Sequence, residues 1–262
     1  MARPHGVHVL DHHPHTDPAL PVVILVHGSL DRASSFARVV RRLPDLHVVT
    51  YDRRGYNHSR APGAAPVDLA GHVEDLLGLV GQGPAVAVGH SYGGDVALGA
   101  ALAAPDAVTA VAAYEPPLSW LDWWPKRPRR PGEDDPARFA EGFFRRMVGD
   151  SSWERLTPTA RAEREADGAA LMAELTALRS GPPPFDVRAL AVPAVFARGE
   201  ASVWHHRRAV DELVAQVRGS ELVEVAGAGH GAHLSHPGAF ADMVRRTLAR
   251  AVSVQEVADR RQ

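Results

Sequence analysis

Short, almost wholly apolar runs recur along the first half of the chain, and polar or glycine-containing turns border each of them. A strand that is buried on both faces gives such a run, whereas a half-buried strand alternates apolar and polar residues. Segments with helical spacing lie between the later runs, at 67–80 and 97–104. This alternation predicts an α/β fold with a mostly parallel, doubly wound sheet. The four runs cover residues 21–26, 46–51, 84–88 and 108–114.

The rhythm of strands and helices stops after the run that ends near Glu115 and resumes at about residue 189. The segment between, residues 116–188, holds four of the five tryptophans. We therefore predict a core domain made of residues 1–115 and 189–262, with a helical cap at 116–188 inserted after about the sixth strand. The further predicted elements are strands at 6–10, 192–197 and 221–225 and helices at 33–43, 136–148, 159–178, 207–217 and 236–251.

The composition excludes several classes of function. The chain has 262 residues with 29 Lys and Arg against 31 Asp and Glu, which excludes a strongly basic nucleic-acid binder. It has no cysteine, so disulfides, thiolate metal sites and a cysteine nucleophile are excluded. The longest apolar stretch, Leu20 to Val26, is too short to span a bilayer, and the start lacks the apolar core of a secretory signal. We expect a cytoplasmic monomer or homodimer that uses no cofactor or metal and binds no nucleic acid or membrane.

A nucleophile motif directly follows the run at 84–88. Residues 89–93 read GHSYG and match the pattern G-x-S-x-G, with Ser91 at the serine position and a helical segment just behind. A serine on such a sharp strand-to-helix turn projects above the sheet, and small residues two positions before and after it relieve crowding. The alternative is an ordinary glycine-rich turn, but the strand–turn–helix context favours a serine nucleophile.

Together with three further motifs, this pattern resembles the α/β-hydrolase family over nearly the whole chain. One motif follows the run at 21–26, a second is similar to the family's D-x-R-G-x-G-x-S, and the third puts a histidine in a glycine-rich loop after the last strand. The resemblance implies the α/β-hydrolase fold, but it is less specific for chemistry because one fold hosts many reactions. The three motifs are His27-Gly28-Ser29, residues 52–59 (DRRGYNHS) and residues 227–230 (GAGH).

The resemblance also implies roles for individual residues. Ser91 would attack the substrate, and His230, in the loop where the family places its base, would take the proton of the serine. The backbone N–H groups of Ser29 and Tyr92 would stabilise the oxyanion. Haloalkane dehalogenases and epoxide hydrolases of the family use an aspartate nucleophile, so Ser91 argues against their chemistry in this chain.

The acid of the catalytic triad is where the chain departs from the family pattern. After the strand at 192–197 relatives usually carry G-x-x-D, but residues 199–202 read GEAS, so Ser202 occupies the position of the aspartate. Glu115 resembles the position from which some haloalkane dehalogenases supply their acid, at the end of the preceding strand. Glu200 is the second candidate, and a chain without a working acid is the third possibility.

The cap and the loops above the sheet are expected to form the substrate pocket. Large aromatic side chains in the cap suit an apolar pocket, although they serve equally well to anchor the cap on the core. Asp31 and Arg32, which follow the oxyanion loop, are predicted to form a local ion pair. The candidate pocket residues are Leu30, Trp120, Trp124 and Trp204.

These assignments predict a metal-free serine hydrolase that cleaves a small-molecule ester, lactone or related acyl compound. An acyl-enzyme would form on Ser91, and water would then resolve it. Two alternatives stay open. The same Ser-His pair could hydrolyse C–C bonds or transfer acyl groups in secondary metabolism, or the protein could bind a ligand without catalysis if it lacks a working acid.

Overall fold

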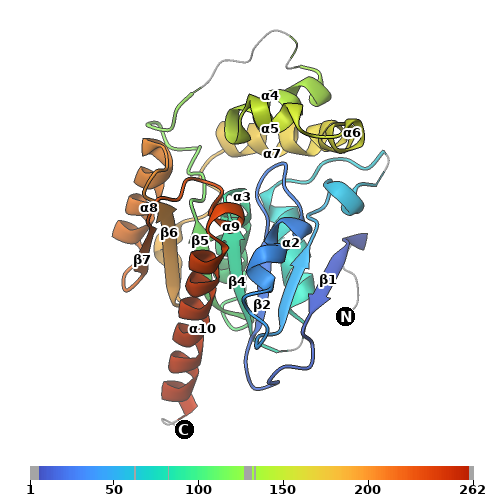
Figure 1. Ribbon diagram of the computed structural model, residues 1–262. Coiled ribbons are helices and arrows are strands. Elements are labelled where there is room, and N and C mark those ends of the chain that lie inside the picture. Colours follow the sequence, from blue (N-terminus) through green and yellow to red (C-terminus); the bar gives the residue numbers. More distant parts are fainter. Residues whose placement is uncertain (1–5, 62, 82, 127–131, 133, 260–262) are drawn as a thin grey trace.

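A seven-stranded sheet forms the centre of the computed structural model, which describes residues 6–61, 63–81, 83–126, 132 and 134–259. The strand order is β1-β3-β2-β4-β5-β6-β7, and every neighbouring pair is parallel except β1 with β3 (Figure 1). The predicted mostly parallel α/β sheet is confirmed. The strands are β1 (Val9–His12), β2 (Val22–Val26), β3 (Val48–Tyr51), β4 (Ala85–His90), β5 (Val108–Tyr114), β6 (Ala194–Gly199) and β7 (Glu221–Val225).

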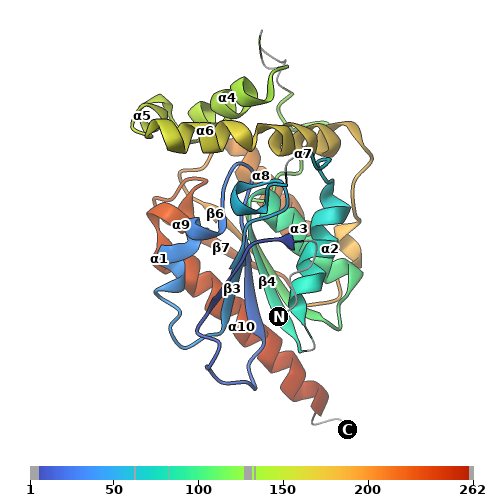
Figure 2. The same cartoon turned by 90° about the vertical axis from the view of Figure 1, so that its right-hand side faces the viewer.

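Helices cover both faces of this sheet (Figure 2). Ile24 and Val26 of β2 are buried in the core on one face, and Val23 and Leu25 are buried in the core on the other. Successive side chains of a strand point to opposite faces, which is why β2 is apolar at every position. The first face is covered by α2 (Leu69–Val80), α3 (Tyr92–Ala103) and α8 (Trp204–Gln216), and the second by α1 (Ala37–Val40), α9 (Ala232–Ser235) and α10 (Pro237–Asp259).

A helical cap between β5 and β6 lies across one end of the sheet (Figure 1). It follows the fifth strand of the chain and not about the sixth, because β1 to β5 are the strands described before it. The predicted single helix at 159–178 is also wrong, because two helices meet there at Asp167. A Cβ on Gly168 would lie 2.0 Å from the Pro136 carbonyl oxygen, so the chain bends where two cap helices touch. The cap consists of α4 (Pro136–Val148), α5 (Asp150–Glu154), α6 (Pro158–Ala166) and α7 (Gly168–Ser180).

Several other element boundaries differ from the prediction; for example, α3 begins at Tyr92 and not at residue 97, and α8 begins at Trp204 and not at residue 207. The first strand begins at Val9 and not at residue 6. Its four residues, Val9–His12, are those that pair with β3, in antiparallel register. The predicted helix at 33–43 is a 3₁₀ turn (Ala33–Phe36) followed by the short helix α1. The last helix continues to Asp259 instead of ending at residue 251. In the part of the chain that the structure describes, no helix has both the length and the apolar character needed to cross a membrane.

A buried ion pair joins the cap to the core. Arg53 Nη1 donates to Glu174 Oε2 of α7 (2.9 Å), and both side chains are fully buried. The guanidinium also lies over the rings of Tyr56 and Tyr92, at 4.7 and 4.8 Å, and its Nε donates to the His27 carbonyl (2.9 Å). Breaking a buried pair by removing one partner costs about 3–5 kcal/mol, because the other charge stays buried without compensation. This contact therefore fixes α7 on the sheet domain.

Asp95 on α3 is buried close to this ion pair. Neither of its carboxylate oxygens has a hydrogen-bond partner among the described residues. Burial raises the pKa of Asp95 well above its ordinary value, and the charge of Glu174 raises it further.

The raised pKa of Asp95 predicts the effect of replacing it. A group whose folded pKa exceeds its unfolded value (about 3.9) stabilises the fold below that value and loses this contribution as pH rises. Asn has a similar volume and no proton to lose. We expect Asp95→Asn to raise the free energy of unfolding at pH 8 and to have a smaller effect near pH 4, as measured by urea denaturation. A variant less stable than wild type at pH 8 would contradict this, and Asp106→Asn, at an exposed position, is the control.

Candidate active site

Ser91 lies on a sharp turn between β4 and α3. Its φ of 54° and ψ of −129° fall in a region that residues other than glycine rarely adopt. The Ser91 N–H donates to the Tyr114 carbonyl (2.8 Å), and the Gly94 N–H donates to the Ser91 carbonyl (2.7 Å). These two bonds hold the strained turn against the neighbouring strand and the start of the helix.

Glycines on both sides of Ser91 make this turn possible. A Cβ on Gly89 would lie 2.0 Å from the Gly93 carbonyl oxygen, and a Cβ on Gly93 would lie 2.2 Å from the Val26 carbonyl oxygen. No side chain fits at either position, because the backbone itself would have to move. The structure thus has the strand–turn–helix geometry that the G-x-S-x-G pattern predicted.

A buried carboxylate holds the imidazole of His230. Glu115 follows β5 directly, has a φ of 47° and is fully buried. Its Oε2 lies 2.7 Å from His230 Nδ1, and its Oε1 accepts a hydrogen bond from the Gly199 N–H (2.7 Å). Because both oxygens are held, the carboxylate has a fixed direction, and the Nε2 atom is the ring nitrogen of His230 left for the cavity. The structure therefore brings together Glu115 and His230, as the strand-end argument predicted.

The second candidate acid lies elsewhere. Glu200 is exposed, and its Oε2 accepts a hydrogen bond from the Gly227 N–H (2.9 Å). It therefore braces the backbone of the loop that carries His230 and does not hold the imidazole. Ser202, at the position of the family's usual aspartate, supplies no carboxylate, and Gly199 from the same loop holds Glu115 instead.

The two amides predicted for the oxyanion hole belong to Ser29, which follows Gly28, and to Tyr92, which follows Ser91. Ser29 lines the cavity that also contains Ser91. Tyr92 is the first residue of α3, so its N–H has no carbonyl one turn earlier in the helix to bond. A Cβ on Gly28 would lie 2.9 Å from the Ser91 Cβ, so this glycine allows the oxyanion loop to approach the nucleophile turn closely.

A cavity of about 450 Å³ lies between the core and the cap, and Ser29, Ser91 and His230 lie in its wall. Its other walls are mostly apolar or aromatic, with arginine and hydroxyl side chains among them. Trp124 is the one of the four predicted pocket residues that lines it. The remaining lining residues are Pro117, Ser119, Pro125, Phe139, Phe143, Arg146, Met147, Leu175, Thr176, Arg179, Ser180, His205 and His206.

The other three pocket predictions are wrong. Leu30 is buried in a small cluster with cap residues and does not line the cavity. Trp120 packs edge-to-face on Phe185, with 5.6 Å between ring centroids, beside a separate hollow. Trp204 is 57% exposed at the start of α8. All three positions depend on how the cap packs on the core, which local sequence does not specify.

Two histidines that the sequence analysis did not single out line the cavity from α8. The rings of His206 and His230 are stacked, with 4.1 Å between centroids and 24° between planes. Burial lowers the pKa of His206 well below its ordinary value, which favours the neutral ring. A neutral ring stacked on His230 restricts the movement of the imidazole. The feature of the sequence that could have indicated these cavity residues is the pair His205-His206, which follows Ser202 closely.

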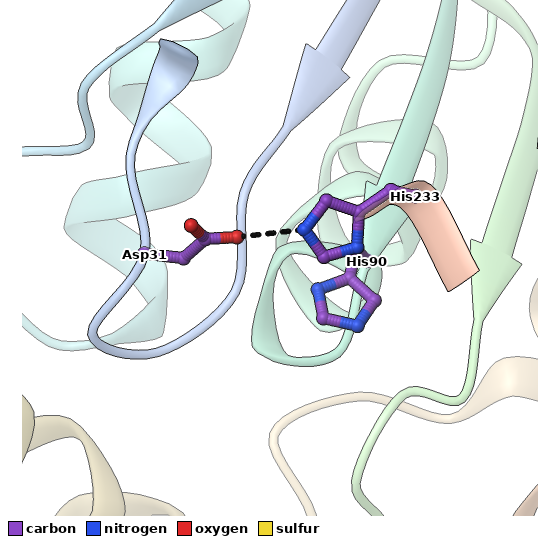
Figure 3. Close-up of side chains that lie close together, drawn as sticks. All are labelled: Asp31, His90 and His233. Atoms are coloured by element: carbon purple, nitrogen blue, oxygen red, sulfur yellow. Dashed lines mark hydrogen bonds and ion pairs between the residues drawn. The ribbon is translucent and has the colours of Figure 1, made fainter. Parts of the chain in front are cut away.

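Two groups of three side chains among the described residues lie close enough together to hold a metal ion. The first contains Glu115, His206 and His230, so an ion there would occupy the imidazole that the serine mechanism needs. The second group lies behind the nucleophile turn and contains the side chain of Asp31 (Figure 3). Its three members are Asp31, His90 and His233.

The predicted ion pair between Asp31 and Arg32 is wrong. Asp31 Oδ2 lies 3.1 Å from Nε2 of His233, which belongs to α9, just after His230. Arg32 instead donates to Glu163 Oε2 of α6 (3.0 Å). Asp31 therefore joins the oxyanion loop to α9, and Arg32 joins it to the cap.

Comparison with known protein families agrees with this geometry. The model of the alpha/beta hydrolase family matches residues 23–243 of the chain. The chain belongs to the alpha/beta hydrolase family. This confirms the family resemblance and the fold that the motifs predicted.

Two curated relatives and a solved structure resemble this chain. Epoxide hydrolase A of Mycobacterium tuberculosis is 38% identical over 134 residues, covering 49% of this chain and 40% of the relative. Lipase LipV of the same organism is 36% identical over 100 residues, 37% of this chain and 38% of the relative. The chain thus spans less than half the length of these relatives. The enol-lactonase from Burkholderia xenovorans LB400 has a TM-score of 0.71 at 22% identity, with 93% of this chain and 96% of that chain covered, which shows a shared fold.

The different positions of the two candidate acids predict different effects of their replacement. Glu115→Gln keeps an oxygen for the Gly199 N–H but removes the charge beside His230. We expect it to slow acylation of Ser91 by a fluorophosphonate roughly 10⁴-fold, as loss of the triad carboxylate does in serine hydrolases. Glu200→Gln, the matched control, should change the rate by less than about threefold, because it alters an exposed side chain. A large effect of Glu200→Gln with a small effect of Glu115→Gln would reverse the assignment.

Proposed function

We propose that this protein is a serine hydrolase that cleaves a small-molecule ester, lactone or related acyl compound through an acyl-enzyme. The observation that carries the proposal is the 2.7 Å contact between Glu115 Oε2 and His230 Nδ1, next to a cavity that contains Ser91. A serine hydroxyl is a weak nucleophile at neutral pH, so it needs an oriented base. The carboxylate and the imidazole are the parts of such a base, and they support catalysis over the alternative of ligand binding without a working acid.

The proposed first half-reaction follows from these positions. His230 donates its Nδ1–H to Glu115, so its Nε2 carries the lone pair that takes the proton from Ser91 Oγ. The oxygen of Ser91 attacks the carbonyl carbon of the substrate, and the N–H groups of Ser29 and Tyr92 stabilise the resulting oxyanion. When the tetrahedral intermediate collapses, His230 returns the proton to the leaving alkoxide. The alcohol leaves, and the acyl group stays on Ser91.

The second half-reaction uses the same groups with water. His230 takes a proton from a water molecule, and the resulting oxygen attacks the acyl carbon. Collapse of the second intermediate releases a carboxylic acid, and His230 gives its proton back to Ser91 Oγ. With a lactone as substrate the hydroxyl and the carboxyl group leave as one molecule.

The cavity supports a substrate of modest size. A volume of about 450 Å³ falls within the range of small-molecule sites, and Trp124, Phe139 and Phe143 give it apolar walls. The similarity in fold to an enol-lactonase is consistent with this class. We infer a small acyl compound, with the apolar part against the aromatic side chains and the scissile carbonyl at Ser91.

A covalent probe tests the nucleophile without a guess about the substrate. Wild-type protein treated with a fluorophosphonate should gain the mass of one adduct, located on Ser91 by peptide mass spectrometry. Ser91→Ala should gain none, because the nucleophilic oxygen is absent. Ser29→Ala, whose backbone N–H remains, should still be labelled.

Labelling has to be accompanied by turnover. The wild type should hydrolyse short-chain nitrophenyl esters or simple lactones, and Ser91→Ala should lose this activity. Folded wild-type protein that reacts with neither a bulky nor a small fluorophosphonate would contradict the proposal. Adduct formation on a residue other than Ser91 would contradict it as well.

A further inference from the structure

The oxyanion loop, the end of β4 and the short helix α9 meet behind the nucleophile turn, and each contributes one metal-binding type of side chain (Figure 3). Asp31 comes from the oxyanion loop, His90 immediately precedes the nucleophile serine, and His233 lies three residues after the base histidine. One oxygen of the carboxylate and one nitrogen of each imidazole all lie within 4.8 Å of one another. These residues are far apart in sequence, so no local sequence pattern indicates that they come together.

The hydrogen bonding of His90 identifies its tautomer. His90 Nε2 lies 2.7 Å from the His230 carbonyl oxygen, and a carbonyl can only accept, so Nε2 carries the hydrogen. Nδ1 therefore carries a lone pair. His90 is only 6% exposed, and its Nδ1 has no hydrogen-bond partner among the described residues.

The lone pair of His90 faces the other two groups. In Figure 3 the Nδ1 atom lies on the side of the ring toward Asp31, as does Nε2 of His233. A Cβ on Gly28 would come within 3.1 Å of His90 Nδ1, so the absence of a side chain there leaves room beside the lone pair. A buried imidazole lone pair without a partner is costly unless something binds it.

Asp31 and His233 supply the remaining donor atoms. His233 is buried against Phe36, and its Nε2 lies 3.1 Å from Asp31 Oδ2. The Asp31 side chain is 17% exposed, which gives an ion a route from solvent.

We propose that Asp31, His90 and His233 form a binding site for one divalent first-row transition-metal ion, such as Zn²⁺ or Co²⁺. Two neutral imidazoles and one carboxylate are a ligand set that these ions favour. With metal–ligand distances of about 2.1 Å, donor atoms lie at most about 4 Å apart, so the side chains close slightly on the ion. His233 keeps one ring hydrogen, which moves from Nε2 to Nδ1 when the metal binds.

The site is separate from the proposed catalytic residues and does not depend on the proposed function. The ion would connect the oxyanion loop, the end of β4 and α9, and would leave the Nε2 atom of His230 free. Because the unfolded chain does not bring the three ligands together, binding should stabilise the folded state. The expected result is a melting temperature that rises with the concentration of the metal.

Cobalt titration of the untagged, full-length protein tests the site. Co²⁺ bound by the wild type should give a visible d–d absorption that saturates, and the melting temperature should rise in parallel. His233→Asn should weaken this binding at least about a hundredfold, since even loss of a residue that only supports a ligand costs 10–100-fold. Asp31→Asn, which keeps the shape of the side chain, should weaken it as well.

Two matched variants separate this site from others. His206→Asn removes a member of the other three-residue group, and His236→Asn removes a partly exposed neighbour of His233; both should bind Co²⁺ as the wild type does. Binding that is lost in His206→Asn and kept in His233→Asn would overturn the proposal. Absence of saturable binding by the folded wild type would overturn it too. If His233→Asn does not fold, X-ray absorption of the cobalt-loaded wild type decides, with two imidazole ligands expected and fewer than two contradicting the site.

Discussion

The hydrogen bond between Glu115 and His230 is the contact on which the proposed chemistry depends. Its carboxylate is fully buried and is held at the other oxygen by the Gly199 N–H at the end of β6. One side chain thereby links the ends of two neighbouring strands to the loop of the imidazole. A carboxylate in such a place is stable only because both oxygens are bonded, and this same bonding gives His230 one orientation.

The rest of the site is arranged around that fixed imidazole. The His230 backbone carbonyl is held by His90 (2.7 Å), and Tyr114 donates its hydroxyl to the Gly229 carbonyl (2.8 Å). The ring of His206 stacks on the ring of His230. Above it, the buried pair of Arg53 and Glu174 fixes α7, which forms part of the cavity wall. The position of the base and the shape of the cavity thus depend on buried polar contacts between segments far apart in the chain.

The sequence alone predicted what the backbone and strand order determine. Nearby backbone atoms leave no room for a side chain at Gly89 or Gly93, so the turn needs these glycines and could be recognised from its sequence pattern. The pairing of Glu115 with His230 could be predicted because adjacent parallel strands open at the same edge. The break at Gly168 and the outward position of Trp204 could not, since both depend on how the cap packs against other segments. The cluster of Asp31, His90 and His233 was missed for the same reason, because the fold alone brings its members together.

A double-mutant cycle on Glu115 and His230 tests the central claim most directly. The rate of Ser91 acylation by a fluorophosphonate would be measured for wild type, Glu115→Gln, His230→Ala and the double variant. If Glu115 acts through His230, the glutamine substitution has no effect once the imidazole is gone, so the double variant reacts at the rate of His230→Ala alone. Independent effects that multiply in the double variant would contradict the account, because Glu115 would then contribute by a route other than the orientation of His230.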